Sequence, residues 1–497
     1  MRHLFYLYSC FNGSFFGELV DEAIELQKSK ENQVLFVYCG GLCEMCTQNA
    51  KGSKSLCHFC TSNTRRVLNY YHIENKNLRD CVKIDSFHTF DYKTASDLRN
   101  ITYKDVHIGL SILSSYITRT RNMDPLIDDI SKKYFDVHLK QCARLAEALN
   151  NIIEDFKPDA VHSFNGRFEE VRPIYDICHN KGIKCYLNEG TKVKGKFKRV
   201  VFEDRLPHDI KYNKERRDYC WNHYQMSQEE KLKFGESFFQ KRRNGIASGD
   251  KIYIKGQEAG NIPPIDKSKL NIAIFNSSED EFVAVGGDWD LLKVFDSQYD
   301  GINYILGHAD PNMHFYLRIH PNLKDIPYRY YTELLSLDKK YSNVTVIRAE
   351  SKVSTYSLLD QMDKVVCFNS TMGMESVYWR VPTICLSAAM YYYEGVCYIP
   401  KNQDDVINLL RKPLEPLFNE NVYKYGAWLM DGSPLTIDNK NVSYEPNDEK
   451  FLGLKYPVYG YLRFLINPQI TAFYLAAGRY IRGLKPFCRY EIPIKER

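Results

Sequence analysis

Residues 160–190 read AVHSFNGRFEEVRPIYDICHNKGIKCYLNEG, and this stretch decides the fold class. Residues 160–164 predict a buried strand, and residues 183–187 predict a second one. The segment between these strands has helical character, and Gly182 is placed to end that helix. Strand, helix and strand in this order form a βαβ unit, in which the two strands are parallel. The sequence therefore predicts an α/β protein built on parallel sheets.

The second half of the chain repeats this alternation. Apolar runs typical of strands occur at residues 270–275, 314–319, 344–347, 365–368 and 383–386. Helical segments separate most of these runs, which predicts a second doubly wound sheet. We therefore expect two Rossmann-like domains that face a cleft, spanning residues 1–250 and 269–430. The segment 251–268 contains two glycines and two prolines and is the best candidate for a linker between them.

Length and composition describe an ordinary globular protein. The 497 residues leave room for two to three domains of about 150 residues each. Hydrophobic residues at 44% and charged residues at 26% exclude a disordered or coiled-coil chain. No uncharged apolar run reaches about 18 residues, and residues 4–10 lack the features of a secretory signal. Fifteen cysteines, an odd number, indicate a reducing compartment, so we expect a cytoplasmic location.

The formal net charge of +5 is concentrated near the C-terminus. Residues 451–497 hold eight Lys or Arg against Glu491 and Glu496, a net of +6 that leaves −1 for the rest of the chain. A basic, aromatic-rich terminal segment is typical of contact with an anionic membrane surface, whereas a nucleic-acid binder spreads its charge along a groove. We expect residues 431–497 to form a crossover onto the first domain or a membrane-associating tail, and we expect no nucleic acid as partner. A solvated terminal helix is the alternative.

Polar clusters follow at least five of the predicted strands. In a parallel sheet the carboxyl ends of the strands share one edge, and ligands bind along that edge. The clusters are Asn165-Gly166-Arg167 and Asn188-Glu189-Gly190 in the first domain, and Asn276 to Glu281, His320-Pro321 and Asn369-Ser370-Thr371 in the second. Each domain is therefore predicted to carry a polar edge, and the cleft is predicted to lie between the two edges.

The clusters of the second domain suit a phosphate group. Ser370 and Thr371 open a helix after a strand, which offers hydroxyls and backbone N–H groups to an anion, although capping of the helix is the alternative. His320 can donate to a phosphate oxygen, and Arg318 adds charge if it shares the same face. A Gly-x-x-x-x-Gly-Lys-Ser/Thr string is absent from the sequence, which argues against a P-loop ATPase.

Glu189 is the candidate general base. It precedes a glycine at a strand end, where a carboxylate can accept a proton from an attacking hydroxyl. A solvated loop carboxylate is the alternative, and the acidic run from Glu279 to Glu281 is a competing candidate on the other domain.

Two CxxC pairs lie ten residues apart, Cys43 with Cys46 and Cys57 with Cys60. Two such pairs converge naturally on a tetrahedral Zn²⁺, with Cys39 as a substitute ligand. An iron–sulfur cluster and free thiols are the alternatives. Since four cysteine ligands leave no open coordination position, the zinc would be structural, and we expect no catalytic metal.

Together these motifs resemble bacterial capsular-polysaccharide and lipopolysaccharide biosynthesis proteins of the GT-B glycosyltransferase type. That group includes the Kdo transferases and, more distantly, the sialyltransferases. The motifs are FNGRF (164–168), NEG (188–190), LPHD (206–209), SSEDE (277–281), RIHP (318–321) and STMGME (370–375). One position departs from the pattern, because the related sialyltransferase turn has two acids before glycine and this chain has Asn188 in the first place.

The resemblance implies a metal-independent transferase that moves a sugar from a nucleotide-sugar donor, CMP-linked by expectation, to a growing capsule or lipopolysaccharide glycan. The acceptor would be a glycan or lipid-linked glycan at the inner face of the bacterial membrane. Residues 1–250, with the cysteine knuckle at 43–60, would bind the acceptor, and residues 269–430 would bind the donor. The implied catalytic residues are Glu189 and His320, the nucleotide-binding residues are Ser277, Ser278, Arg318, His320, Pro321, Ser370, Thr371 and Glu375, and the acceptor-binding residues are Asn165, Arg167 and His208.

Two other functions fit the same residues. A polyol-phosphate transferase of the teichoic-acid type also resembles this chain in its two Rossmann-like halves, its histidines and its Ser-Thr helix start. A noncatalytic glycan-assembly factor that keeps the GT-B scaffold is the second alternative, and weak nucleotide binding would favour it.

Overall fold

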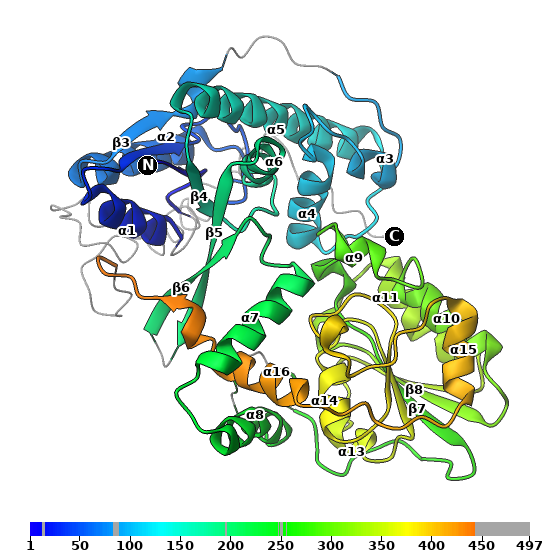
Figure 1. Cartoon of the computed structure of the whole chain (residues 1–497). Helices are drawn as coiled ribbons and strands as arrows, with labels where there is room; N and C mark the ends of the chain where they lie inside the picture. Colours follow the sequence, from blue (N-terminus) through cyan, green and yellow to red (C-terminus); the bar gives the residue numbers. More distant parts are fainter. Residues whose placement is uncertain are drawn as a thin grey trace, which may run out of the picture. The chain divides into compact units, whose positions relative to one another are not determined.

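The computed structural model describes residues 1–11, 15–82, 89–193, 196–246, 248, 252–254 and 256–442, without the side chains of 191–197 (Figure 1). The chain divides into two compact units, each with its own sheet. The first comprises Met1–Pro207 and the described residues from Thr436 onward, and the second comprises His208–Leu435. The α/β class with two mainly parallel sheets is confirmed, while the predicted cleft between the domains stays a prediction.

The first unit holds one seven-stranded sheet and six helices among its described residues. Its elements are β1 (Arg2–Leu7), α1 (Phe15–Gln27), β2 (Gln33–Tyr38), α2 (Lys54–Tyr70), β3 (Glu74–Asn77), α3 (Ala95–Arg99), α4 (Ile108–Thr120), α5 (Asp129–Phe156), β4 (Ala160–Phe164), α6 (Arg172–Lys181), β5 (Lys184–Val193), β6 (Lys196–Glu203) and β12 (Thr436–Ile437). The βαβ unit predicted from residues 160–190 is β4, α6 and β5.

The second unit holds a five-stranded sheet. Its elements are α7 (Ile210–His223), α8 (Gln228–Arg243), β7 (Leu270–Phe275), α9 (Asp288–Leu291), α10 (Gln298–His308), β8 (Met313–Arg318), α11 (Arg329–Leu335), α12 (Leu337–Lys340), β9 (Val344–Ile347), α13 (Thr355–Leu359), β10 (Lys364–Cys367), α14 (Met372–Tyr378), β11 (Thr383–Cys385), α15 (Gln403–Arg411) and α16 (Asn421–Met430). The five predicted strands are β7 to β11, with ends that differ by one residue at most.

Both sheets have the same strand order. The first runs β3-β2-β1-β4-β5 and then adds β6 and β12 by antiparallel pairing. The second runs β9-β8-β7-β10-β11 and is parallel throughout. This is the Rossmann order. The second and third strands are added on one side of the first strand, and the later strands are added on its other side. The crevice at this change of side lies between β1 and β4 in one unit, and between β7 and β10 in the other.

Each face of the second sheet packs on its own set of helices. One face contributes Ile272, Ile274 and Leu317 to a core with α10 and α15. The alternate residues Ala273 and Phe275 face a second core with α8, α13, α14 and α16. Side chains alternate between the faces of a strand, so nearly continuous apolar runs are needed to fill both cores. Figure 1 shows these helix groups on either side of β7 and β8.

The unit boundary differs from the one drawn in the sequence. The structure assigns α7 and α8 to the second unit, whereas the sequence analysis places the boundary after residue 250. The physical reason is packing, because Phe238 and Phe239 of α8 are fully buried in a core of the second unit. Tyr224, just after α7, also donates its hydroxyl to the Ala427 carbonyl at 3.2 Å. Such long-range contacts leave no periodic signal in the sequence.

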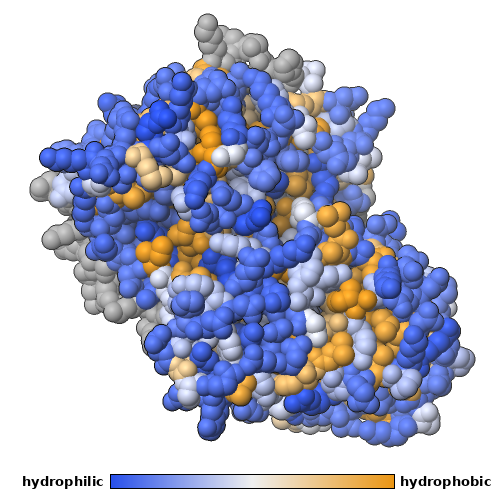
Figure 2. Space-filling view, viewed as in Figure 1, coloured by the Kyte–Doolittle hydropathy of each residue, from blue (hydrophilic) through white to orange (hydrophobic). Residues whose placement is uncertain are grey.

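The segment after α16 returns to the first unit. Thr436 pairs with Val200 in the sheet, and the backbone N–H of Lys440 donates to Asp21 at 3.1 Å. The predicted basic tail, residues 451–497, lies outside the described residues. Among the residues that are described, none of the helices is long and apolar enough to cross a bilayer. Figure 2 shows one face of the molecule, which is mostly hydrophilic with small apolar patches.

Candidate functional site

A pocket opens at the carboxyl edge of the second sheet. Its free volume is about 60 Å³, room for several water-sized groups. The strand ends supply these residues: Phe275 ends β7 and Asn276 follows it, Arg318 ends β8 and His320 comes two residues later, and Ser370 and Thr371 follow β10. Because β7 lies between β8 and β10, these residues meet at the point where the strand order reverses.

Six of the eight predicted nucleotide-binding residues line this pocket. They are Arg318, His320, Pro321, Ser370, Thr371 and Glu375. The other two, Ser277 and Ser278, are buried and are not among its lining residues. The Ser277 hydroxyl accepts a hydrogen bond from the Gln298 amide at 2.8 Å, and its backbone N–H donates to the same side chain.

Arg318 places a buried positive charge beside the pocket. The residue is 4% exposed, and its guanidinium donates to two backbone carbonyls, those of Arg348 at 2.6 Å and Ser351 at 3.2 Å. Among the described residues, the Nε–H group has no hydrogen-bond partner, and the guanidinium forms no ion pair. Burial lowers the pKa of Arg318 to about 10, an effect that Glu350 partly opposes. A buried cation without a carboxylate partner is poised to bind an anion.

His320 is held in one tautomer. The backbone N–H of Asn322 donates to its Nδ1 at 3.2 Å, so the hydrogen of a neutral ring is on Nε2. The His320 backbone N–H donates to Asn276 at 2.8 Å, and the Ser278 hydroxyl lies 3.4 Å from Nδ1. An Nε2–H group is the donor that a phosphate oxygen needs. The strand ends of β7 and β8 therefore fix the orientation of this ring.

Glu375 is paired inside the protein. Its carboxylate accepts from Arg242 Nε at 3.0 Å, from the Thr371 hydroxyl at 3.2 Å, and from the hydroxyl of Tyr356. Arg242 also donates to Thr371 Oγ1 at 3.4 Å. Although Glu375 and Thr371 line the pocket, this network makes Glu375 a positioning group for the Ser370–Thr371 turn. The burial of Tyr356 and its bond to Glu375 raise the pKa of that phenol well above its usual range.

Five polar residues of the pocket were not predicted from the sequence. They are Arg242, Tyr253, Gln257, Thr355 and Tyr356. Tyr253 places its ring edge-on to His320 with centroids 5.0 Å apart, although it lies in the segment predicted to be a linker. Gln257, from the same segment, accepts a hydrogen bond from the Thr355 backbone at 2.8 Å. None of these residues follows a predicted strand, so strand-end reasoning had no signal for them.

The candidate base Glu189 lies on β5 of the first unit. The Asn165 amide donates to its Oε1 at 2.6 Å, so two predicted residues from neighbouring strands meet. Burial raises the pKa of Glu189 to about 7, and Asn165 and Arg167 limit that rise. A carboxylate with a pKa near neutrality is suited to accept a proton. Asn165 itself has a φ of +55°, a left-handed conformation that asparagine tolerates.

The other predicted acceptor residues are distributed over both units. Arg167 lies beside Asn165, donates to the Thr118 hydroxyl at 3.1 Å, and packs its guanidinium over the ring of Phe168. His208 belongs to the second unit, where its carbonyl accepts a hydrogen bond from Trp289 Nε1 at 2.8 Å. The joint role of His208 with Arg167 stays a prediction.

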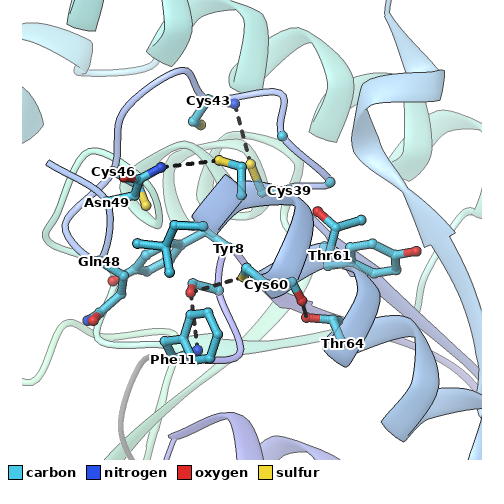
Figure 3. Close-up of a pocket in the computed structure, with 16 residues that line it drawn as sticks. Tyr8, Phe11, Cys39, Cys43, Cys46, Gln48, Asn49, Cys60, Thr61 and Thr64 are labelled. Carbon is cyan, nitrogen blue, oxygen red and sulfur yellow. Dashed lines mark hydrogen bonds between the residues drawn. The ribbon is translucent and has the colours of Figure 1, made fainter. Parts of the chain in front are cut away.

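The CxxC cysteines line a second, smaller hollow at the carboxyl ends of β1 and β2 (Figure 3). The lining cysteines are Cys39, Cys43, Cys46, Cys57 and Cys60. Within the part of the chain that the structure describes, no three His, Cys, Asp or Glu side chains form a ready metal site. The cysteine-knuckle insertion is therefore not confirmed, and zinc stays a prediction.

Part of the second unit matches a known family. Residues 254–423 match the family described as capsule polysaccharide biosynthesis protein. This segment contains the predicted motifs at 277–281, 318–321 and 370–375. The resemblance to capsule biosynthesis proteins is confirmed for this part of the chain. No curated protein matches the sequence.

Solved structures overlap the chain at low similarity. KpsC from Thermosulfurimonas dismutans, a beta Kdo 2,7 transferase, shares 13% identity with a TM-score of 0.33, over 56% of this chain and 80% of its own. A UDP-GlcNAc 2-epimerase from Neisseria meningitidis, bound to UDP-GlcNAc, shares 12% identity with a TM-score of 0.23, over 87% of this chain and 95% of its own. A putative UDP-N-acetylglucosamine 2-epimerase from Listeria monocytogenes shares 10% identity with a TM-score of 0.25, over 86% and 90%.

Proposed function

We propose that this protein is a glycosyltransferase of capsule polysaccharide assembly that binds a nucleotide-sugar donor in the pocket of the second unit. The family match over residues 254–423 supports the biological setting. The observation that carries the chemistry is Arg318, a buried guanidinium whose Nε–H has no partner among the described residues and which lines the same pocket as His320. A phosphate group placed there would offset the buried charge and accept from both side chains.

The pocket would stabilise the leaving group. When the bond between the sugar and the phosphate breaks, the departing nucleotide keeps the electron pair and gains negative charge. Arg318 and His320 are fixed donors on that side, so they stabilise the charge as it develops. Fixed side-chain donors can serve in this step without a metal ion, which is why we propose metal-independent catalysis. A CMP-linked acidic sugar is our first choice of donor.

Glu189 would serve the other half of the reaction. Its carboxylate accepts the proton of an acceptor hydroxyl while the hydroxyl oxygen bonds to the sugar carbon. Asn165 orients the carboxylate, and Arg167 is next to it at the same strand end. A pKa of about 7 keeps a useful fraction of Glu189 ionised at neutral pH. The acceptor in this proposal is a capsule glycan, free or lipid-linked.

Nucleotide binding is tested first, by thermal shift with CMP, CDP, UDP and GDP. A ligand at about 100 times its Kd stabilises the folded state by about 2.7 kcal/mol, enough to raise the Tm measurably. We expect a CMP-selective shift that His320→Ala abolishes. The matched control is His308→Ala, because His308 is exposed at the end of α10 and does not line the pocket.

The nucleotide that produces a thermal shift distinguishes the proposed function from its alternatives. A shift with UDP or GDP alone keeps the glycosyltransferase and discards the CMP donor. A CDP preference favours the polyol-phosphate transferase, whose donor would present the same phosphate chemistry. No shift with any nucleotide, or an equal shift in His320→Ala, rejects the proposed site and favours a noncatalytic scaffold.

Transfer itself is tested with the donor that the binding screen selects. Glu189→Gln keeps the shape of the side chain and removes the base, so transfer should fall by about 100-fold or more. The same variant should retain the nucleotide shift, because Glu189 lies in the first unit and the pocket in the second. Unchanged transfer would remove Glu189 from the mechanism without touching the donor site.

A further inference from the structure

Six cysteines from distant segments gather at the carboxyl edge of the first sheet. Cys10 follows β1, Cys39 follows β2, and the others come from the next loop and from α2. Five of them line the hollow shown in Figure 3. The sixth, Cys10, does not line it, but its Sγ lies 3.9 Å from Sγ of Cys60. The predicted CxxC pairs are therefore joined in space by Cys39, the predicted substitute ligand, and by Cys10, which the prediction did not include.

Three of these sulfurs have hydrogen-bonding groups aimed at them. The backbone N–H of Cys43 donates to Sγ of Cys39 at 3.3 Å. The Asn49 amide donates to Sγ of Cys57 at 3.4 Å, and the Ser9 hydroxyl lies 3.3 Å from Sγ of Cys60. Figure 3 draws these contacts as dashed lines. Hydrogen bonds donated to sulfur stabilise a thiolate and orient it as a metal ligand.

The lining of the hollow contains no cationic side chain, and Arg79, which lies near Cys57, is not part of that lining. The residues that line it include no Lys, Arg or His. The space at its centre is about 20 Å³, room for one water-sized atom and too little for the iron and sulfide atoms of a cluster. A thiolate-rich hollow of this size is suited to a single soft divalent cation.

We propose that this hollow binds one structural Zn²⁺ through Cys39, Cys57, Cys60 and one thiolate of the Cys43–Cys46 turn. Among the described residues the sulfurs do not yet converge on a metal-sized centre, so binding in this proposal requires the cysteine side chains to rotate inward from the wall of the hollow. The ligand set differs from the two CxxC pairs, because Cys39 takes the place of one member of the first pair. Cys10 is not one of the proposed ligands, and its thiol donates to the backbone carbonyl of Cys60 at 3.5 Å.

The zinc would fix the loop between β2 and α2, which carries Cys39, Cys43 and Cys46. Within this loop, the Thr47 hydroxyl donates to Glu170 at 2.8 Å, and the Met45 carbonyl accepts from Gln141 at 2.9 Å. Glu170 closely follows the Asn165–Arg167 segment, so a metal in the hollow would fix the loop beside it. This role is independent of the proposed transferase activity.

The metal content of the purified full-length chain tests the proposal. Mass spectrometry with inductively coupled plasma should find about one zinc per chain in wild type. Cys39→Ser and Cys57→Ser should each lose most of it, while Cys10→Ser should keep it. The matched control is Cys142→Ser, which removes a buried cysteine of α5 outside the hollow and should also keep the zinc.

A second measurement covers the case in which Cys39→Ser fails to fold. Wild-type protein titrated with a mercurial that modifies thiols should release its zinc in step with the modification. Protein loaded with Co²⁺ instead should show thiolate-to-cobalt charge-transfer absorption in the near ultraviolet. Wild-type chain without zinc after growth in zinc-supplemented medium, iron with sulfide in its place, or a folded Cys39→Ser that keeps its zinc would each overturn the proposal.

Discussion

Arg242 donates its Nε–H to Oε1 of Glu375 across 3.0 Å, with the side chains 7% and 1% exposed. The pair joins α8 to α14 and forms part of the wall of the pocket in the second unit. Glu375 also receives the hydroxyl of Thr371, so the ion pair determines where the Ser370–Thr371 turn lies. The stability of the second unit and the geometry of its pocket are therefore linked through these two residues.

Breaking this pair should destabilise the second unit. Glu375→Gln leaves the Arg242 guanidinium buried without a counter-charge, which costs about 3–5 kcal/mol. The control is Glu229→Gln, since Glu229 forms an exposed pair with Lys233 and should change stability by about 0–1 kcal/mol. Urea unfolding of both variants measures the difference. Equal midpoints would show that the buried pair adds nothing.

Helix α14 should tolerate no side chain at Gly373. A Cβ there would overlap the Tyr391 hydroxyl and lie 2.6 Å from Sγ of Cys367, so Gly373→Ala should cost about 1–3 kcal/mol. It should also weaken nucleotide binding, because α14 follows the Ser370–Thr371 turn directly. Gly307→Ala in α10 is the control, where a Cβ meets its nearest atom at 3.4 Å and the change should be small. Thermal unfolding with and without nucleotide compares the two variants.

Glu18 should make the first unit less stable as the pH rises. Burial raises the pKa of this carboxyl from 4.5 to about 8, against the attraction of Arg199. The folded state therefore binds a proton that the unfolded state releases above about pH 4.5, and stability is lost between that pH and about 8. Glu18→Gln removes the titration, so it should be near neutral at pH 5 and stabilising by about 4 kcal/mol at pH 8.

The Glu18 prediction is checked by urea unfolding of wild type and variant at both pH values. Glu74→Gln, at an exposed position of β3, is the control and should show no such dependence. A Glu18→Gln effect that is the same at pH 5 and pH 8 would contradict the assignment.

The rate of transfer should follow the ionisation of Glu189. With a pKa of about 7, the rate should rise with pH through neutrality and level off above it. Asn165→Asp removes the donor to Glu189 and adds a like charge, so the midpoint should move to higher pH by about one unit or more. Lys184→Gln, an exposed change on the same strand, should leave the midpoint in place. Profiles of kcat/KM against pH measure these shifts.

Local patterns were sufficient for the βαβ unit of residues 160–190, for the strands of the second sheet and for many site residues. Gly182 ends α6 in a left-handed conformation with a φ of +64°, as its position after the helix predicts. His320, Ser370 and Thr371 line one pocket because each follows an apolar strand, and such strands end at a common edge. The order of the apolar runs and the polar residues that follow them are enough to place these side chains together.

Site residues that lie outside strand ends were not predictable in the same way. Arg242 enters the pocket from α8, a helix that the sequence analysis placed in the other domain. Ser277 follows β7 like its predicted neighbours, but its hydroxyl turns to Gln298. Which face a loop residue presents depends on the packing of elements far away in the chain, and no local period records that packing.

The sequence by itself determined the α/β class, the strands of the second sheet, β4 and β5 of the first sheet, and the identity of most polar groups at the carboxyl edges. These features follow from the periodicity of apolar residues, which is a local property of the chain. Only the tertiary structure decided that Arg318 is a buried cation with no carboxylate paired to it among the described residues, that Glu375 is committed to Arg242, and that Cys10 lies against the CxxC cysteines. Burial and pairing are properties of three-dimensional packing, since they depend on which distant side chains exclude water from a group.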